Sequence, residues 1–368
     1  MKKTGARPLR ISVFLASLTG SLLASDGTPG SISWAMLVMT TLGGLALFLY
    51  GMGKMSEGMK KAAGNRMRSV LTVVTNNRVI GLIVGAFVTM VIQSSSATTV
   101  MLVSFVEAEL MTFVQTLGVI LGADIGTTIT AQLIAFRLTD YALLMIAAGF
   151  AITLFARKDS HRNAGEAILG FGILFFGMYL MSDAMAPLQT YEPFLQVLKR
   201  FENPLVGLAV GTASTALLQS SAAFIGIVIV FAQQGLLPLE AGIPLIFGAN
   251  IGTCVTAGLA SIGASREAKR VALAHVLFKI GGVLLFILWI PTFADFVRWI
   301  SPVGAGSGAA KLAAEAPRQI ANAHTIFNVS LALIFLPFTL LFSRYVYRFF
   351  PTVEAEKKLR PVTWHLDE

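Results

Sequence analysis

The chain has 368 residues, of which 55% are hydrophobic and only 13% are charged. A soluble globular protein carries roughly 25% charged residues, so this composition indicates an integral membrane protein. The net charge of +9 does not indicate nucleic-acid binding, because most basic residues lie in short links between apolar segments. The single cysteine, Cys254, excludes an intramolecular disulfide and a thiolate metal cluster.

The first predicted element is the N-terminal segment, residues 1–32. It begins with basic residues and continues in an apolar run that is too short for a comfortable membrane crossing. A signal peptide and a short signal anchor both fit this pattern, because no clean A-x-A cleavage site follows. Either one places the N-terminal charges in the cytoplasm.

The remainder of the chain is predicted to contain a duplicated membrane unit. Aligned with itself at an offset of 126 residues, the sequence gives 27 identities in 90 ungapped positions, with Gly44 opposite Gly170 and Leu133 opposite Leu259. We therefore predict two transport repeats. The expected segments are repeat 1 (33–160), repeat 2 (161–290), an extracellular loop with a final transmembrane helix (291–343) and a cytoplasmic tail (344–368).

Each repeat is predicted to begin with a long apolar helix, near residues 33–57 and 164–186. Two short apolar arms follow, in the first repeat at 79–92 and 97–106. A spanning helix needs about 20 residues, so these arms predict a re-entrant helical hairpin. A broken transmembrane helix carrying G-A-x-I-G-T, whose glycines would permit an unwound turn, and one further span complete the repeat.

The predicted fold class is an all-α integral membrane protein with two inverted-topology repeats. Each repeat crosses the membrane an odd number of times, so consecutive repeats must be inverted. Placing the link between Lys54 and Arg78 inside puts 21 of the 28 lysines and arginines inside as well, in agreement with the positive-inside rule. The two hairpins then enter from opposite sides, and their tips meet near the midplane.

Polar residues interrupt the apolar arms at both predicted tips, with "QSSS" at 93–96 and "QSSA" at 219–222. Non-helical backbone is tolerated in a membrane only where protein or water satisfies it, so these tips predict a polar cavity. A helix that starts at a tip directs free N–H groups and its positive dipole toward an anion, while hydroxyl and amide oxygens suit sodium.

An alternative is that these hydroxyls only bond to their own helix or allow close helix packing. The recurrence of both motifs favours a binding site, because each polar tip is followed 29 residues later by its glycine motif, "GADIGTT" from Gly122 and "GANIGTC" from Gly248.

Paired motifs of this kind in inverted repeats resemble the sodium-phosphate cotransporter family, which contains the animal type II transporters and bacterial relatives. The resemblance covers roughly residues 33–343. It implies a non-enzymatic secondary transporter of inorganic phosphate, with sodium as the coupling ion and no other cofactor or metal, working by alternating access in the bacterial inner membrane with its C-terminus in the cytoplasm. Phosphate, sodium and the lipid bilayer are the implied partners. The site residues that the resemblance implies are Gln93, Ser94, Ser95, Ser96, Asp124, Thr127, Thr128, Gln219, Ser220, Ser221, Asn250 and Thr253.

Several positions depart from the family pattern. Asp124 stands where the family usually has asparagine, Ala222 interrupts the second serine run and Cys254 replaces a threonine. Only about 25 residues follow Arg344, so the soluble regulatory domain of some bacterial relatives is not expected.

A further departure is a charge inside a predicted span. "AHVLFKIGG" (274–282) resembles "AHTIFNVSL" (323–331), so Lys279 aligns with Asn328 in a motif that the family writes H-x-x-F-N. Lys279 is a candidate cation facing the anion path, because intramembrane charges are functional candidates by default. An equally weighted alternative is that the Lys279 side chain snorkels toward the membrane interface or pairs with an acid such as Asp183.

Other functions remain open from the sequence: a phosphate exporter or sensor, a transporter of another small anion, or an intramembrane serine hydrolase using His275 or His324. The chain lacks a G-x-S-x-G motif and its serines occur as symmetric pairs, which disfavours the hydrolase. Transport direction, sodium stoichiometry and oligomeric state are not determined by these patterns.

Overall fold

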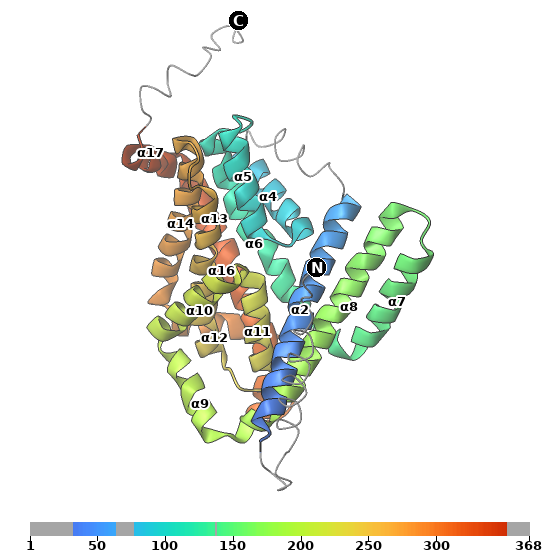
Figure 1. Ribbon diagram of the computed structural model, residues 1–368. Helices are drawn as coiled ribbons and strands as arrows, with labels where there is room; N and C mark the ends of the chain where they lie inside the picture. The colour runs from blue at the N-terminus through green and yellow to red at the C-terminus, as the bar shows by residue number, and fades with distance from the viewer. Residues whose placement is uncertain (1–31, 64–76, 137, 352–368) are drawn as a thin grey trace, which may run out of the picture.

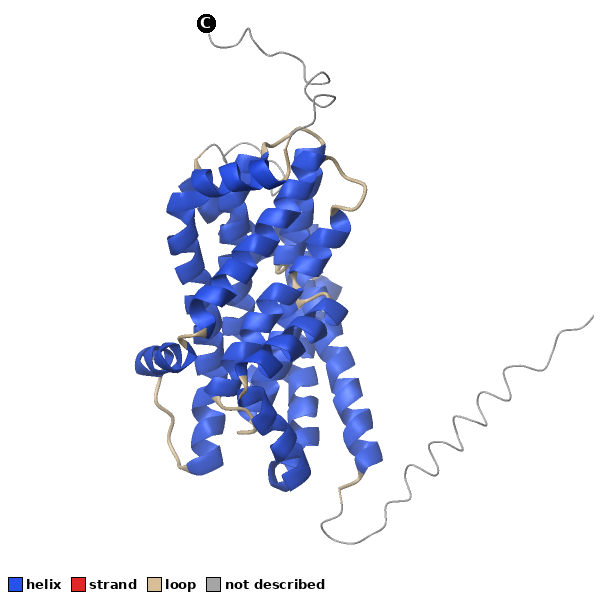
Figure 2. Ribbon diagram, turned by 90° about the vertical axis from the view of Figure 1, so that its left-hand side faces the viewer, coloured by secondary structure: helices blue, strands red, loops and turns tan. Residues whose placement is uncertain are grey.

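A computed structural model describes residues 32–63, 77–136 and 138–351, and every regular element within these ranges is a helix (Figures 1 and 2). The predicted N-terminal signal segment, part of the basic link after the first long helix and most of the predicted cytoplasmic tail lie outside the described residues.

The helices follow the predicted repeats in chain order. The first repeat contains α2 (Trp34–Ala63), α4 (Arg78–Ile92), α5 (Ser95–Glu107), α6 (Phe113–Ile134), the 3-10 helix η1 (Leu138–Tyr141) and α7 (Ala142–Phe155). The second contains α8 (Asp159–Met185), η2 (Ala186–Thr190), α9 (Glu192–Lys199), η3 (Arg200–Glu202), α10 (Pro204–Leu218), α11 (Ser221–Gln233), α12 (Leu239–Gly252), α13 (Cys254–Ala260) and α14 (Arg266–Ile287). The last elements are α15 (Ile290–Ile300), α16 (Gly308–Phe335), η4 (Leu336–Phe338) and α17 (Thr339–Phe349).

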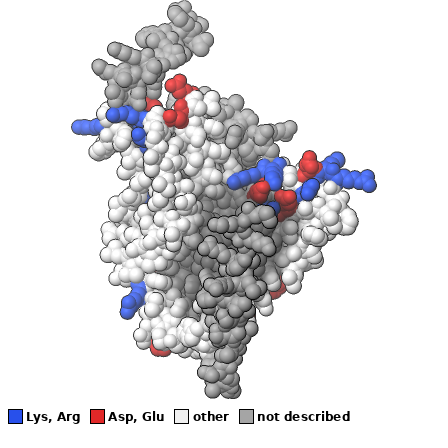
Figure 3. Space-filling model, in the orientation of Figure 1, with Lys and Arg blue, Asp and Glu red and all other residues white. Residues whose placement is uncertain are grey.

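Seven helical segments among the described residues are long and apolar enough to cross a membrane. Many of their apolar side chains face outward: Leu144 and Phe155 of α7 are 66% and 77% exposed. Figure 3 shows Lys, Arg, Asp and Glu gathered toward the upper and lower ends of the molecule, with uncharged surface between them. An apolar belt of this kind is solvated by lipid rather than water, so the predicted multi-pass, all-α membrane protein is confirmed.

The two long helices α2 and α8 pack closely along a line of glycines. A Cβ atom on Gly44 would lie 2.8 Å from the carbonyl oxygen of Gly177, and one on Gly51 would lie 2.6 Å from that of Gly170. Residue numbers therefore rise along α2 as they fall along α8, and the two helices are antiparallel. Gly44 and Gly51 are also the repeat equivalents of Gly170 and Gly177, so exchanging the two repeats converts the Gly44–Gly177 contact into the Gly51–Gly170 contact.

Each helical hairpin packs against the glycine-motif helix of its own repeat. A Cβ on Gly122 of α6 would lie 1.9 Å from the carbonyl oxygen of Leu82, and one on the equivalent Gly248 of α12 would lie 2.2 Å from that of Leu208. The same interhelical contact therefore occurs in both repeats, 126 residues apart. In Figure 1 the α4–α5 hairpin occupies the upper half of the molecule and the α10–α11 hairpin the lower half.

The prediction of a broken helix in the first repeat is wrong. Helix α6 runs without interruption from Phe113 to Ile134 through its glycine motif. The motif glycines do not unwind the backbone; they let the helix approach α4 more closely than any side chain would allow. In the second repeat the helix is interrupted only at Thr253, between α12 and α13.

Candidate functional site

The first hairpin turns within two residues, Gln93 and Ser94. Gln93 adopts the left-handed conformation (φ 60°) and ends α4. Ser94 is the N-cap of α5, and its side chain accepts a hydrogen bond from the backbone N–H of Ala97 (3.1 Å). The cap uses one donor of the first helical turn, so the N–H groups of Ser95 and Ser96 lack intrahelical partners and point out of the helix end.

The second hairpin repeats this geometry at equivalent residues. Gln219 is left-handed (φ 53°) and ends α10. Ser220 caps α11 by accepting a hydrogen bond from the N–H of Ala223 (3.2 Å). The sequence repeat of the polar tips is therefore also a repeat of two helix N-termini built in the same way.

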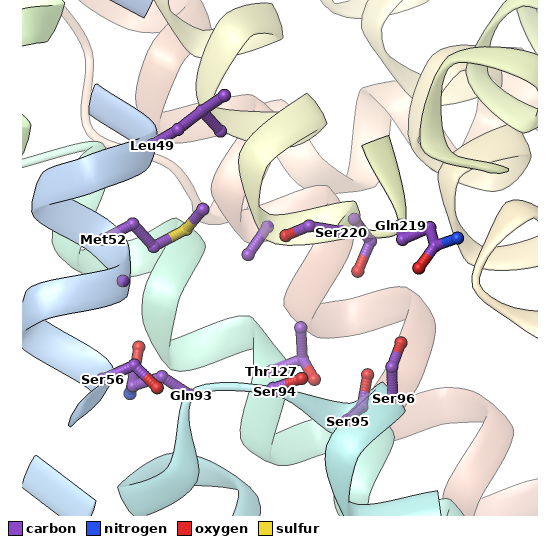
Figure 4. A pocket seen from close by; sticks show the side chains of 13 residues that line it. Leu49, Met52, Ser56, Gln93, Ser94, Ser95, Ser96, Thr127, Gln219 and Ser220 are labelled. Atoms are coloured by element: carbon purple, nitrogen blue, oxygen red, sulfur yellow. The ribbon is translucent and has the colours of Figure 1, made fainter. Parts of the chain in front are cut away.

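Both tips border one cavity of about 190 Å³ (Figure 4). Helices α2 and α6 complete its wall, and α6 contributes Thr127. Its lining residues are Leu49, Met52, Gly53, Ser56, Gln93, Ser94, Ser95, Ser96, Thr127, Gln219, Ser220, Ser221 and Ala222. The structure thus gathers the predicted tip residues of both repeats and Thr127 around a polar space whose described lining carries no charged side chain.

The contribution of α2 was missed by the sequence reasoning. Ser56 lines the cavity and donates a hydrogen bond to the backbone carbonyl of Ile92 (2.7 Å), which ties α2 to the end of α4. The available signal was the recurrence of "MSEGM" (55–59) as "MSDAM" (181–185). Ser182, its equivalent, instead accepts a hydrogen bond from Gln234.

Two predicted threonines do not reach the cavity. The Thr128 hydroxyl donates to the carbonyl of Ile125 (2.7 Å), and the Thr253 hydroxyl donates to the carbonyl of Asn250 (2.6 Å). Both hydroxyls are thus satisfied by their own helix, which is the ordinary role of threonine in membrane helices.

Asp124, Asn250 and Lys279 do not line the cavity, but they form a second polar cluster. The Lys279 ammonium nitrogen lies 2.8 Å from Asp124 Oδ1, 2.7 Å from Asn250 Oδ1 and 3.2 Å from Asn328 Oδ1. All four residues are buried. The acid paired with Lys279 is therefore Asp124, and the suggested partner Asp183 is wrong.

The two tip glutamines differ in their contacts. Gln93 is buried; its Oε1 accepts from the Thr130 hydroxyl (2.5 Å) and its Nε2 donates to the Met90 carbonyl (2.5 Å). Gln219 is exposed, and the hydroxyl of Thr256, the equivalent of Thr130, is buried without a hydrogen-bond partner among the described residues. The Gln–Thr hydrogen bond is therefore present in the first repeat, and the equivalent residues of the second repeat do not form it.

A model of the Na+/Pi-cotransporter family matches residues 47–183 and 187–313. The chain belongs to the Na+/Pi-cotransporter family. This confirms the resemblance inferred from the paired motifs.

Relatives of this chain differ in how much of their length aligns with it. The uncharacterized protein YqeW of Bacillus subtilis is 30% identical over 318 residues, covering 86% of this chain and 99% of YqeW. The putative inorganic phosphate export protein YjbB of Escherichia coli is 26% identical over 337 residues, covering 90% of this chain but only 59% of YjbB. The mouse sodium-dependent phosphate transport protein 2C is 38% identical over 87 residues, or 23% of this chain. No solved structure matches the chain.

Proposed function

We propose that this Na+/Pi-cotransporter family member carries inorganic phosphate across the membrane together with sodium, by alternating access around the cavity between the two hairpin tips. The observation that carries the proposal is the convergence of two serine-capped helix N-termini on one uncharged cavity. Free N–H groups and hydroxyls at such ends bind anions without a positively charged side chain.

The charge balance supports sodium as a second ligand. Each helix N-terminus is equivalent to roughly half a positive charge, so two of them supply about one. A hydrogenphosphate dianion would leave about one negative charge unbalanced. No lysine or arginine lines the described wall to neutralise it, and hydroxyl and amide oxygens are available to coordinate sodium.

The packing of the repeats supports inverted topology. The equivalent helices α2 and α8 are antiparallel along their glycine contacts. The tips of the two hairpins face the same cavity from different sides (Figure 4). Inverted repeats with a site at their interface are the architecture through which secondary transporters alternate access. We place the described parts of the basic links at 54–78, 157–162 and 266–270, together with the C-terminus, on the cytoplasmic side of the inner membrane.

Hydrolysis is less consistent with the site, because neither His275 nor His324 lines the cavity that holds the tip serines. Export is a second candidate for the direction of transport, since the YjbB proteins that align with most of this chain are named as putative phosphate exporters. The sodium gradient and the direction of net flux decide between uptake and export.

Radiolabelled phosphate flux in proteoliposomes tests the proposal, with sodium gradients imposed in either direction. We expect flux that follows the sodium gradient in the wild type. The hydroxyls of Thr127 and Thr128 both donate to carbonyls of α6, but only Thr127 lines the cavity. Thr127→Ala should therefore reduce the flux, whereas the neighbouring Thr128→Ala should retain it. Equal flux with and without sodium, or equal loss in both variants, contradicts this assignment.

Calorimetry tests the role of sodium in binding. Because linkage is reciprocal, replacing sodium by choline at constant ionic strength should weaken phosphate binding at least about tenfold, or 1.4 kcal/mol. Unchanged phosphate affinity in choline would exclude sodium from the binding site.

A further inference from the structure

Lys279 lies at the meeting point of four helices, α6, α12, α14 and α16. Its side chain is 3% exposed, and its ammonium is held by oxygens of Asp124, Asn250 and Asn328 at 2.7 to 3.2 Å. An ammonium group has three N–H donors and no acceptor. Three acceptors within hydrogen-bonding distance therefore satisfy it completely.

The two asparagines are held with their oxygens toward the ammonium. Asn250 Nδ2 donates to the carbonyl of Ile246 (3.0 Å), and Asn328 Nδ2 donates to the carbonyl of His324 (2.8 Å). Each amide nitrogen is thus used by its own helix, which leaves the amide oxygen for the cluster. The two amide oxygens are therefore oriented by bonds that do not involve the ammonium.

We propose that this oxygen cluster is a monovalent-cation site and that Lys279 fills it with a covalently attached cation in place of sodium. One carboxylate and two amide carbonyl oxygens are the types of oxygen ligand that hard cations take in proteins, and sodium is a hard cation. The ammonium supplies the one positive charge that Asp124 requires. In this protein the position is consequently closed to free sodium, and any sodium that accompanies phosphate binds elsewhere.

The charges of this cluster explain why an occupant is needed. A buried carboxylate without a compensating cation is strongly unfavourable. Three other titratable groups interact with this cluster: His275, whose Nε2 lies 3.8 Å from Asp124 Oδ1, the buried His324 on α16 and the buried Cys254 on α13. The Lys279 ammonium is closer to the carboxylate, at 2.8 Å, so Lys279 is its principal partner.

Removing the lysine should open the site. In Lys279→Asn, a third amide joins Asp124, Asn250 and Asn328, and the cluster carries one negative charge. The experiment compares melting temperatures of the purified full-length protein in sodium chloride and in choline chloride at equal ionic strength, without phosphate. We expect sodium to raise the melting temperature of Lys279→Asn by about 2 °C more than that of the wild type, as for sodium at roughly ten times its Kd and an unfolding entropy scaled to a chain of 368 residues.

Two further variants identify the source of this effect. In Asp124→Asn/Lys279→Asn the cluster is neutral, so the additional sodium response should disappear. Lys279→Met retains the carboxylate and much of the packing of the lysine stem, so it should show a sodium response of the same sign as Lys279→Asn. Equilibrium binding of radioactive sodium should give one more bound ion in Lys279→Asn than in the wild type.

The proposal is overturned if sodium stabilises Lys279→Asn and Lys279→Met no more than the wild type. It is also overturned if the additional response persists without the Asp124 carboxylate, or if both single variants fail to fold in sodium as well as in choline. Because no phosphate is used, these outcomes do not depend on whether the serine cavity transports phosphate.

Discussion

The two tip glutamines provide a matched test of the asymmetry between the repeats. Gln93→Ala removes the partners of the buried Thr130 hydroxyl and of the Met90 carbonyl. Leaving a buried polar group unsatisfied costs about 1–3 kcal/mol, and Thr130 can recover part of this by bonding to its own helix. Gln219→Ala removes an exposed side chain and should change stability by less than about 0.5 kcal/mol.

The backbone makes this comparison unusually clean. Gln93 and Gln219 are both left-handed, with φ of 60° and 53°, so alanine experiences the same backbone preference at either position. The assay is thermal unfolding in detergent, followed by phosphate flux in proteoliposomes. We expect Gln93→Ala to have the lower melting temperature, while both variants lose flux because both glutamines line the cavity. Equal melting temperatures, or a less stable Gln219→Ala, would refute the reasoning.

Two other predictions concern the cavity and the topology. Gly53 lines the cavity and Gly43 lies on the same helix, and a Cβ at either position meets no atom within 4 Å, so leucine should be accommodated at both. Gly53→Leu should nevertheless abolish phosphate flux, whereas Gly43→Leu should retain it. Wild-type flux in Gly53→Leu would show that this space is not the transport site. In a Cys254→Ser background, Lys60→Cys and Glu192→Cys should react with an impermeant thiol reagent from opposite sides of the membrane, because three predicted spans separate these exposed positions; labelling from one side would contradict the inverted arrangement.

Helix positions and the tip residues could be predicted because the sequence contains their physical causes. Short apolar arms on either side of "QSSS" and "QSSA" indicated helical hairpins, and α4, α5, α10 and α11 occupy those arms. Duplication of the polar tips indicated a shared site, and the tips do line one cavity. Both inferences rest on local periodicity and on repetition, which need no knowledge of tertiary packing.

The glycine motif shows why other features could not be predicted. Glycine permits an unwound turn, but it also permits close helix packing, and the sequence does not distinguish these uses. Only the position of α4 against Gly122 decides in favour of packing. The role of Ser56 was similarly hidden, because α2 is far from the tips in sequence and its serine differs from other helix serines only by its place in the fold.

Asp124 and Lys279 illustrate how two unexplained departures become one explained feature. Asp124 departs from asparagine in its motif, as Asn250 in the second repeat shows, and Lys279 departs from the asparagine found at Asn328. Either change alone would bury an unpaired charge, and removing one partner of a buried ion pair costs about 3–5 kcal/mol, a large part of a typical stability of about 5–15 kcal/mol. Together they place opposite charges 2.8 Å apart and leave the cluster neutral. The two residues are 155 positions apart in the sequence. That the charge of Lys279 neutralises the charge of Asp124 is therefore visible only in the structure, where α6 and α14 are in contact.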